Sequence, residues 1–186
     1  MKLVWVKKIA GVENLPKSGA YIIAANHASY FDFLALASVW PKRVYFLAGE
    51  VFFKKWWWRP LVKWTGQIKV DRECSDKSEV YGKVFAVLKN GGVVGIFPEG
   101  TRSADGKLGK AFTGVAKFAL QANCPVVPVG IYGTYQVMSR YDKLPKFKKI
   151  IKIKIGKPIC LEGDQSENSL RQNTDKIMGE INNLIN

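Results

Sequence analysis

The chain has 186 residues, and its 29 Lys and Arg against 15 Asp and Glu give a formal net charge of +14. Hydrophobic residues make up 47% and charged residues 24%, which is ordinary globular usage and excludes intrinsic disorder as the default state. This length predicts one domain, and the charge predicts an anionic partner: nucleic acid, an anionic membrane, or a phosphorylated or acidic substrate.

The cysteines and the N-terminus indicate the expected environment. Cys74, Cys124 and Cys160 are widely spaced and odd in number, a pattern that suggests neither a disulfide framework nor a zinc cluster. Residues 1–8 are too short and too interrupted by lysine for a signal peptide, and no apolar stretch reaches the about 18 residues that span a bilayer. We expect a reduced, cytosol-facing chain that is soluble or rests on a surface.

Buried apolar runs alternate with helical patterns along the whole chain, which is typical of an α/β fold. In chain order the patterns predict a strand at 20–25, a helix at 33–39, strands at 43–48 and 67–70, a helix at 75–89, a strand at 92–97, a helix at 111–122, strands at 125–132 and 151–155, and a helix at 170–185. The helix at 75–89 is the clearest, with Val84 and Leu88 on its apolar face and Ser75 as its expected cap. We therefore expect a mixed, mostly parallel sheet flanked by helices.

His27, the only histidine, follows the first of these strands, and Asp32 comes five residues later. Strand carboxyl ends are where α/β sheets place ligands, and an imidazole that titrates near pH ~6.5 suits a general base. A carboxylate on the other ring nitrogen would fix the tautomer if a turn brought it back, because five helical residues separate two side chains by about 140°. The alternative is a structural histidine with Asp32 as a helix N-cap. Ser29 is interpreted as a turn or capping residue rather than a nucleophile.

A second polar cluster, Phe97-Pro98-Glu99-Gly100-Thr101-Arg102-Ser103, follows the strand at 92–97. A glycine lets the backbone approach a ligand, a threonine adds a hydroxyl, and an arginine offers a planar fork suited to phosphate. The alternative is a solvated turn in which Glu99 pairs with Arg102.

Two further segments complete the set. Residues 66–72 place Lys69 and Arg72 at the end of a short strand, and residues 125–129 form an apolar strand that we interpret as a wall of the site.

Together, these segments resemble the glycerolipid acyltransferases, the family of 1-acyl-glycerol-3-phosphate (lysophosphatidate) acyltransferases. Residues 26–32 are similar to the family's Asn-His-x-x-x-x-Asp motif, and residues 97–103 match its Phe-Pro-Glu-Gly-Thr-Arg-Ser motif residue for residue. Residues 66–72 and 125–129 resemble its second and fourth motifs, in the family's order. The resemblance extends over nearly the whole chain.

The resemblance implies an enzyme that moves a fatty acyl group from acyl-CoA or acyl carrier protein to the sn-2 hydroxyl of 1-acyl-glycerol-3-phosphate, giving phosphatidic acid for phospholipid biosynthesis. It implies that His27 is the general base and that Asp32 orients it. The implied acceptor ligands are Arg102 with Lys69 or Arg72 for the phosphate, and Glu99, Gly100 and Thr101 for the glycerol part. No cofactor or metal is implied, since one histidine and scattered cysteines offer no transition-metal site.

Many relatives in that family carry a longer membrane-anchoring segment before the histidine motif, whereas 25 residues precede Asn26 here. We expect residues 1–186 to be a single acyltransferase domain without that segment. Tryptophan prefers the headgroup level of a bilayer and basic residues attract anionic lipid, which favours the tryptophan-rich stretch 51–64 as a replacement. The expected membrane-docking residues are Lys54, Lys55, Trp56, Trp57, Trp58 and Arg59. The predicted location is the cytoplasmic face of the cell membrane, peripheral and without a transmembrane segment.

A second basic stretch and several alternatives stay open. The lysines between Lys146 and Lys157 are interpreted as a solvated strand face or as a docking site for an acidic carrier protein or lipid. The same chemistry fits glycerol-3-phosphate or another lysolipid as acceptor. A basic nucleic-acid-binding module is an alternative of a different class, disfavoured because no nucleic-acid motif is present. A lipid-binding protein without activity is disfavoured because all motif residues are present, and the oligomeric state is not indicated.

Overall fold

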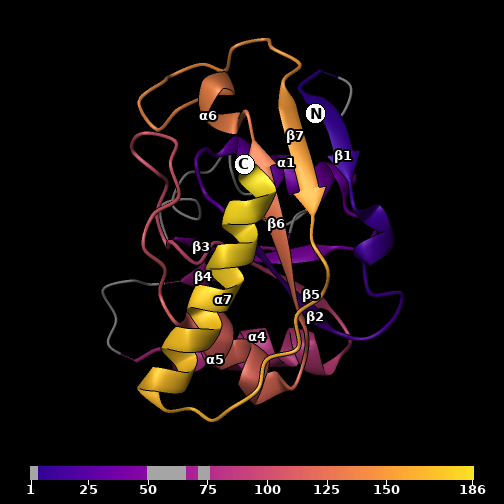
Figure 1. Ribbon diagram of the computed structural model, residues 1–186, viewed down its shortest axis with the longest axis vertical. Coiled ribbons are helices and arrows are strands. Elements are labelled where there is room, and N and C mark those ends of the chain that lie inside the picture. Colours follow the sequence, from indigo (N-terminus) through magenta and orange to yellow (C-terminus); the bar gives the residue numbers. More distant parts are fainter. Residues whose placement is uncertain (1–3, 50–65, 71–75) are drawn as a thin grey trace.

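The computed structural model describes residues 4–49, 66–70 and 76–186. In these residues seven strands form one sheet in the order β1-β7-β6-β2-β5-β3-β4 (Figure 1). The strands are β1 (Val6–Ala10), β2 (Tyr21–Ala25), β3 (Val44–Gly49), β4 (Ile68–Val70), β5 (Val93–Ile96), β6 (Val126–Tyr132) and β7 (Ile151–Ile155). The strands from β6 to β4 are parallel to one another, whereas β7 is antiparallel to β6 and β1 is parallel to β7. The predicted mixed, mostly parallel α/β sheet is confirmed.

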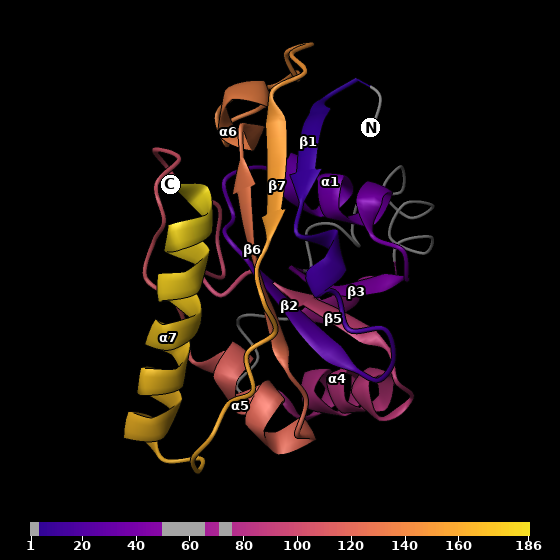
Figure 2. The same cartoon turned by 45° about the vertical axis from the view of Figure 1, so that its right-hand side comes forward.

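Helices cover both faces of this sheet (Figure 2). They are α1 (Phe31–Val39), α4 (Ser78–Lys89), α5 (Gly114–Ala122), the short α6 (Thr134–Val137) and α7 (Glu167–Ile185), with a 3-10 turn η1 at Val12–Asn14. Buried apolar side chains of α1 contribute to one cluster, and buried apolar side chains of α4, α5 and α7 contribute to a second. The sheet is therefore the middle layer of three.

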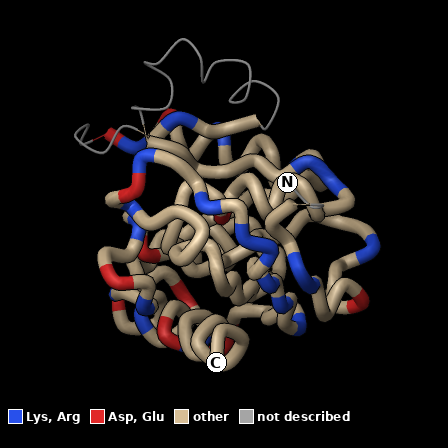
Figure 3. Tube along the Cα trace, turned by 90° about the horizontal axis from the view of Figure 1, so that it is seen from above, with Lys and Arg blue, Asp and Glu red and all other residues tan. Residues whose placement is uncertain are grey.

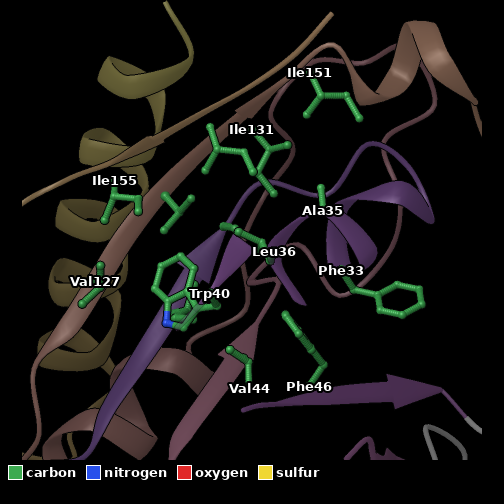
Figure 4. Close-up of a cluster of buried hydrophobic side chains, with 14 of the residues drawn as sticks. Phe33, Ala35, Leu36, Trp40, Val44, Phe46, Val127, Ile131, Ile151 and Ile155 are labelled. Carbon is green, nitrogen blue, oxygen red and sulfur yellow. The ribbon is translucent and has the colours of Figure 1, made fainter. Parts of the chain in front are cut away.

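Strand β2 lies at the centre of this arrangement and is buried on both faces. Tyr21 and Ile23 point into the cluster that includes Leu36, Trp40 and Phe46, part of which Figure 4 shows. Ile22 and Ala24 point into the cluster on the other face. Because helices cover both sides, the strand carries apolar residues throughout, and its carboxyl end rests on a rigid support.

The structure corrects some of the predicted boundaries. Helix α4 begins at Ser78 rather than at residue 75, and the Oδ1 atom of Asp76 accepts the Ser78 N–H at 2.8 Å. The predicted cap, Ser75, lies outside the described residues. Helix α5 begins three residues later than predicted, at Gly114.

Strand β1 was missed because two consecutive lysines interrupt its apolar pattern. These residues, Lys7 and Lys8, are exposed at the edge of the sheet, where charged side chains are tolerated. Strand β7 alternates buried isoleucine with exposed lysine, as its period-2 pattern predicted. In the described ranges, every helix falls short of the length or the apolar character required to cross a membrane.

Candidate active site

His27 and Asp32 meet in a tight turn between β2 and α1. Asp32 lies in the first turn of α1, and its Oδ2 atom is 2.9 Å from His27 Nδ1. The same oxygen accepts the backbone N–H groups of Ala28 and Ser29, both at 2.7 Å. The chain reversal that the pairing requires is therefore present. Asp32 is not the N-cap of α1, since Tyr30 occupies that position and makes no side-chain cap bond.

The contacts of Asp32 determine which nitrogen of His27 faces a substrate. Because Oδ2 already accepts two backbone N–H groups, it acts as an acceptor toward the imidazole too, so Nδ1 is the donor in this contact and Nε2 is the ring nitrogen left for a substrate. Asp32 is fully buried, and in the described part of the chain its Oδ1 atom has no partner, so all its hydrogen bonds converge on Oδ2. The imidazole is 17% exposed and stacks on Phe97 at 4.1 Å between ring centroids. The ring is held in one orientation and remains accessible.

Asn26 and Ser29 connect this turn to the neighbouring strand. The Asn26 amide accepts the Ile131 N–H at 2.7 Å and donates to the Ile131 carbonyl at 2.8 Å. The Ser29 hydroxyl donates to the Met138 carbonyl at 2.6 Å and accepts the Phe31 N–H at 3.0 Å. Ser29 therefore has the contacts of a turn residue, in agreement with its interpretation from the sequence.

Glu99 supports the same turn from β5. Its carboxylate is 5% exposed, and its Oε1 atom accepts the His27 backbone N–H at 2.7 Å. Its Oε2 atom accepts the Gly109 N–H at 2.8 Å. Burial raises the pKa of Glu99 above its ordinary value, against the opposing effect of these two hydrogen bonds. Among the described residues the carboxylate makes no ion pair with Arg102, and it acts as a clamp on backbone groups.

The rest of the Glu99–Arg102 segment lies beside the turn. Gly100 has a φ of +66°, and a Cβ there would lie 3.0 Å from the Phe112 ring, so glycine suits this position on two counts. Thr101 is exposed. The Arg102 guanidinium lies over the Tyr30 ring at 3.5 Å from its centroid, and partial burial lowers its pKa without removing its charge.

The other predicted ligands are not all brought to this point. Lys69 is exposed in β4, the third strand from β2, which corresponds to about 14 Å across the sheet. Arg72 lies outside the described residues, as do the expected docking residues Lys54, Lys55, Trp56, Trp57, Trp58 and Arg59. Arg102 is therefore the predicted phosphate ligand that the described residues place next to His27.

A cavity of about 400 Å³ adjoins the turn. Asn26 and Ala28, the two neighbours of His27, line it together with residues 131–136 and the last residues of α7. Open space therefore borders the backbone of the histidine turn.

Comparison with known proteins identifies the family to which this geometry belongs. A family model described as Acyltransferase matches residues 7–132, a range that includes the His27 turn and the Glu99 clamp. The chain belongs to the acyltransferase family.

Individual members of the acyltransferase family match over much of the chain. The 1-acyl-sn-glycerol-3-phosphate acyltransferase of Bacillus subtilis is 31% identical over 153 residues, which cover 82% of this chain and 73% of that protein. The alpha enzyme of the same name from Homo sapiens is 30% identical over 69% of this chain, and the match spans only 46% of the human protein. The crystal structure of the 1-acyl-sn-glycerophosphate (LPA) acyltransferase PlsC from Thermotoga maritima has a TM-score of 0.78 at 28% identity, covering 96% of this chain and 72% of that one.

Two residues of this acyltransferase site were not assigned roles from the sequence. Phe97 belongs to the quoted motif, but only the structure shows that its ring supports the imidazole. Tyr30 lies between the two motif positions of the turn, and its ring carries the Arg102 guanidinium. An aromatic residue inside a polar turn is a signal that could have indicated the second role.

Proposed function

We propose that the protein transfers a fatty acyl group from a thioester to the sn-2 hydroxyl of a 1-acyl-glycerol-3-phosphate, forming phosphatidic acid for phospholipid biosynthesis. The observation that carries the proposal is the 2.9 Å contact between His27 Nδ1 and Asp32 Oδ2 at the carboxyl end of β2. The names of the relatives from Bacillus subtilis and Thermotoga maritima support this choice of acceptor.

In the proposed reaction His27 is the general base and Asp32 positions it. Nε2 removes the proton of the acceptor hydroxyl as that oxygen attacks the thioester carbonyl, and the Asp32 carboxylate stabilises the imidazolium that forms. The tetrahedral intermediate expels the thiolate, which takes the proton back from His27. The ester bond forms as the thioester bond breaks, and the free thiol and the neutral imidazole are regenerated without a covalent enzyme intermediate.

Arg102 is the proposed ligand of the acceptor phosphate. Its planar fork matches phosphate geometry, and its stacking on Tyr30 holds the guanidinium beside the histidine turn. Gly100 and Thr101 are proposed to position the glycerol part, and Lys69 or Arg72 is proposed as a second cation for the phosphate. Glu99 contributes by holding the backbone of His27, because both of its oxygens already accept backbone N–H groups.

The proposed donor is acyl-CoA or an acyl carrier protein, and the proposed place of action is an anionic bilayer to which the protein binds peripherally. The net charge of +14 and the tryptophan-rich stretch 51–64 support this location. Membership of the acyltransferase family favours this assignment over a nucleic-acid-binding module.

The release of free thiol tests the proposal. Purified protein with acyl-CoA should release CoA at a rate that depends on added lysophosphatidate. Equal release with and without acceptor would reject the acyltransferase assignment. A panel containing glycerol-3-phosphate, other lysophospholipids and a monoacylglycerol would show whether a different acceptor is preferred.

A further inference from the structure

The segment between α6 and β7 exposes apolar side chains. We call residues 139–149 the basic loop, which forms the top of the molecule in Figure 1. Three of its side chains protrude into solvent: Tyr141 is 71% exposed, Leu144 78% and Phe147 82%. Large apolar side chains exposed three residues apart are a costly arrangement unless a partner covers them.

The same loop is strongly basic. It has one carboxylate, Asp142, and five cations: Arg140, Lys143, Lys146, Lys148 and Lys149. The Asp142 carboxylate makes contacts within the loop: one oxygen accepts the Ser139 N–H at 2.8 Å, and the other lies 3.8 Å from Lys146 Nζ. Figure 3 views the molecule from this end, where Lys and Arg are more frequent than Asp and Glu along the trace that faces the reader.

Contacts with the body of the protein hold the loop in this conformation. The Lys146 N–H donates to the Val137 carbonyl at 2.8 Å, and Trp5 Nε1 donates to the Lys146 carbonyl at 3.1 Å. The Trp5 ring also stacks against Phe147, with centroids 5.7 Å apart. Because the backbone is anchored, the three apolar side chains are presented outward by the fold.

The basic loop lies near the carboxyl ends of the parallel strands, as the active site does. Strands β2 and β6 are parallel, so the His27 turn after β2 and the segment after β6 emerge together. Ser29 Oγ in the turn donates to the Met138 carbonyl, just before the loop, at 2.6 Å. Arg140 Nη1 in the loop donates to the carbonyl of Arg102, the residue that lies over Tyr30 of the turn, at 3.2 Å. A surface bound to the loop is therefore held next to His27 and Arg102.

We infer that the basic loop docks on the surface of an anionic bilayer, with Tyr141, Leu144 and Phe147 at the headgroup level and the surrounding cations on lipid phosphates. Apolar and aromatic side chains interleaved with lysine are the pattern that interfacial binding requires, and each surface lysine adds attraction to anionic lipid. The inference deepens the proposed function, since a docked loop delivers a bilayer-resident lysolipid to His27.

Vesicle binding of the full chain tests the inference. The apolar variant is Tyr141→Ser with Leu144→Ser, which leaves the Phe147 stack on Trp5 intact. The charge variant is Lys143→Gln with Lys148→Gln and Lys149→Gln. The probes are phosphatidylcholine vesicles with and without phosphatidylglycerol, measured by co-sedimentation.

The apolar variant should bind both kinds of vesicle at least about tenfold more weakly. The charge variant should lose roughly a hundredfold in affinity for anionic vesicles, at about fivefold per lysine, and little for neutral ones. Wild-type affinity of either variant for anionic vesicles would overturn the inference, as would equal wild-type binding to anionic and neutral vesicles.

Matched controls come from the opposite end of the molecule, near the amino ends of the parallel strands. Val12→Ser removes an exposed apolar side chain of η1, and Lys17→Gln with Lys42→Gln and Lys89→Gln removes three exposed cations. Both controls should bind vesicles like the wild type. Losses equal to those of the loop variants would show general charge or hydrophobicity instead of a docking site, and would overturn the inference.

Turnover separates this inference from the proposed function. On a short-chain lysophosphatidate dissolved as monomers, the loop variants should keep wild-type turnover, whereas on vesicles their turnover should fall with their binding. Absence of wild-type turnover on both substrates would reject the proposed function and leave vesicle binding as the test of the loop. Loop variants that bind vesicles normally but lose turnover with an acyl carrier protein thioester would assign the surface to that acidic protein and overturn the membrane inference.

Discussion

Two segments that follow neighbouring strands depart in opposite ways from the rule that charged side chains are exposed and apolar side chains are buried. The His27 turn, residues 26–32, buries a carboxylate completely and surrounds it with N–H donors. The basic loop after β6 does the reverse, exposing three large apolar side chains among cations. Both features lower stability unless they are compensated: hydrogen bonds compensate the buried carboxylate, and a partner that covers them would compensate the exposed apolar side chains.

This difference indicates separate roles for the two segments, which lie at the same end of the parallel strands. In the turn, Asp32 and Phe97 hold the imidazole and Glu99 holds the backbone of His27, which leaves a single ring nitrogen for chemistry. In the loop, contacts anchor the backbone and leave the side chains to solvent. Changes in the turn should therefore alter turnover without altering vesicle binding. Changes in the loop should weaken vesicle binding without altering turnover on a monomeric substrate.

Replacing His27 by Ala tests one half of this comparison with the largest expected effect. Removing the general base should lower kcat by at least ~10²–10⁴-fold, because the variant lacks the imidazole that takes the hydroxyl proton. Turnover is measured as CoA released per enzyme with saturating lysophosphatidate. Vesicle binding and thermal unfolding should match the wild type, and near-normal turnover would remove His27 from its assigned role.

Asp32→Asn retains an acceptor for the Ala28 and Ser29 N–H groups but removes the negative charge. We expect kcat to fall on the order of a hundredfold, since the imidazolium loses its electrostatic partner. The shape of the pH profile of kcat should change as well as its maximum value. A purely structural role predicts instead a loss of thermal stability with an unchanged pH profile in the protein that remains folded.

Arg102→Ala sharpens the comparison within the site, because it changes recognition rather than proton transfer. Loss of a charge-assisted contact should raise KM for lysophosphatidate about 10–100-fold, with a smaller effect on kcat. Arg102→Lys should recover part of the loss, since it restores charge without the planar fork. An equal loss with a monoacylglycerol acceptor would contradict phosphate binding.

Glu99→Ala should mainly affect stability. It leaves the His27 and Gly109 N–H groups without their acceptor, at a cost of about 1–3 kcal/mol in the free energy of unfolding. Turnover should fall as well, because the backbone of His27 is released. Denaturant unfolding measures the first effect, and an unchanged midpoint would show that the clamp contributes nothing.

The pH dependence of unfolding gives the smallest expected effect. Burial raises the pKa of Glu99 above its ordinary 4.5, so the native state binds more protons than the unfolded state between the two values. The stability from this group is complete below pH 4.5 and is lost as pH rises through the higher pKa. Stability relative to Glu99→Gln should therefore fall with rising pH in that window, and a rise would contradict the burial argument.

The fold and the contact between His27 and Asp32 could be predicted because their signals are local. The alternation of isoleucine and lysine predicted β7, and the spacing of His27 and Asp32 after a buried strand indicated that pairing would need a turn that brings the carboxylate back. The same logic missed β1, where edge position, which depends on the whole sheet, permits two consecutive lysines.

Contacts between distant segments were beyond the sequence. The two backbone N–H groups that donate to Glu99 lie 72 and 10 residues away along the chain, so its contacts with the turn depend on tertiary packing. The lysines from Lys146 onward were interpreted as a solvated face or a docking site, and our inference of a membrane-docking loop rests on the exposure of Leu144 and Phe147, which only the structure gives. These contacts could not be predicted because the residues that make them lie far apart in the sequence.

The central claim is that the His27 turn acylates lysophosphatidate at the sn-2 position. Mass spectrometry of the lipids formed from isotopically labelled acyl-CoA and 1-acyl-glycerol-3-phosphate tests it most directly. We predict labelled phosphatidate with the label at sn-2, formed at least about 100-fold more slowly by His27→Ala. Label on another acceptor, or equal rates with and without the histidine, would contradict the account.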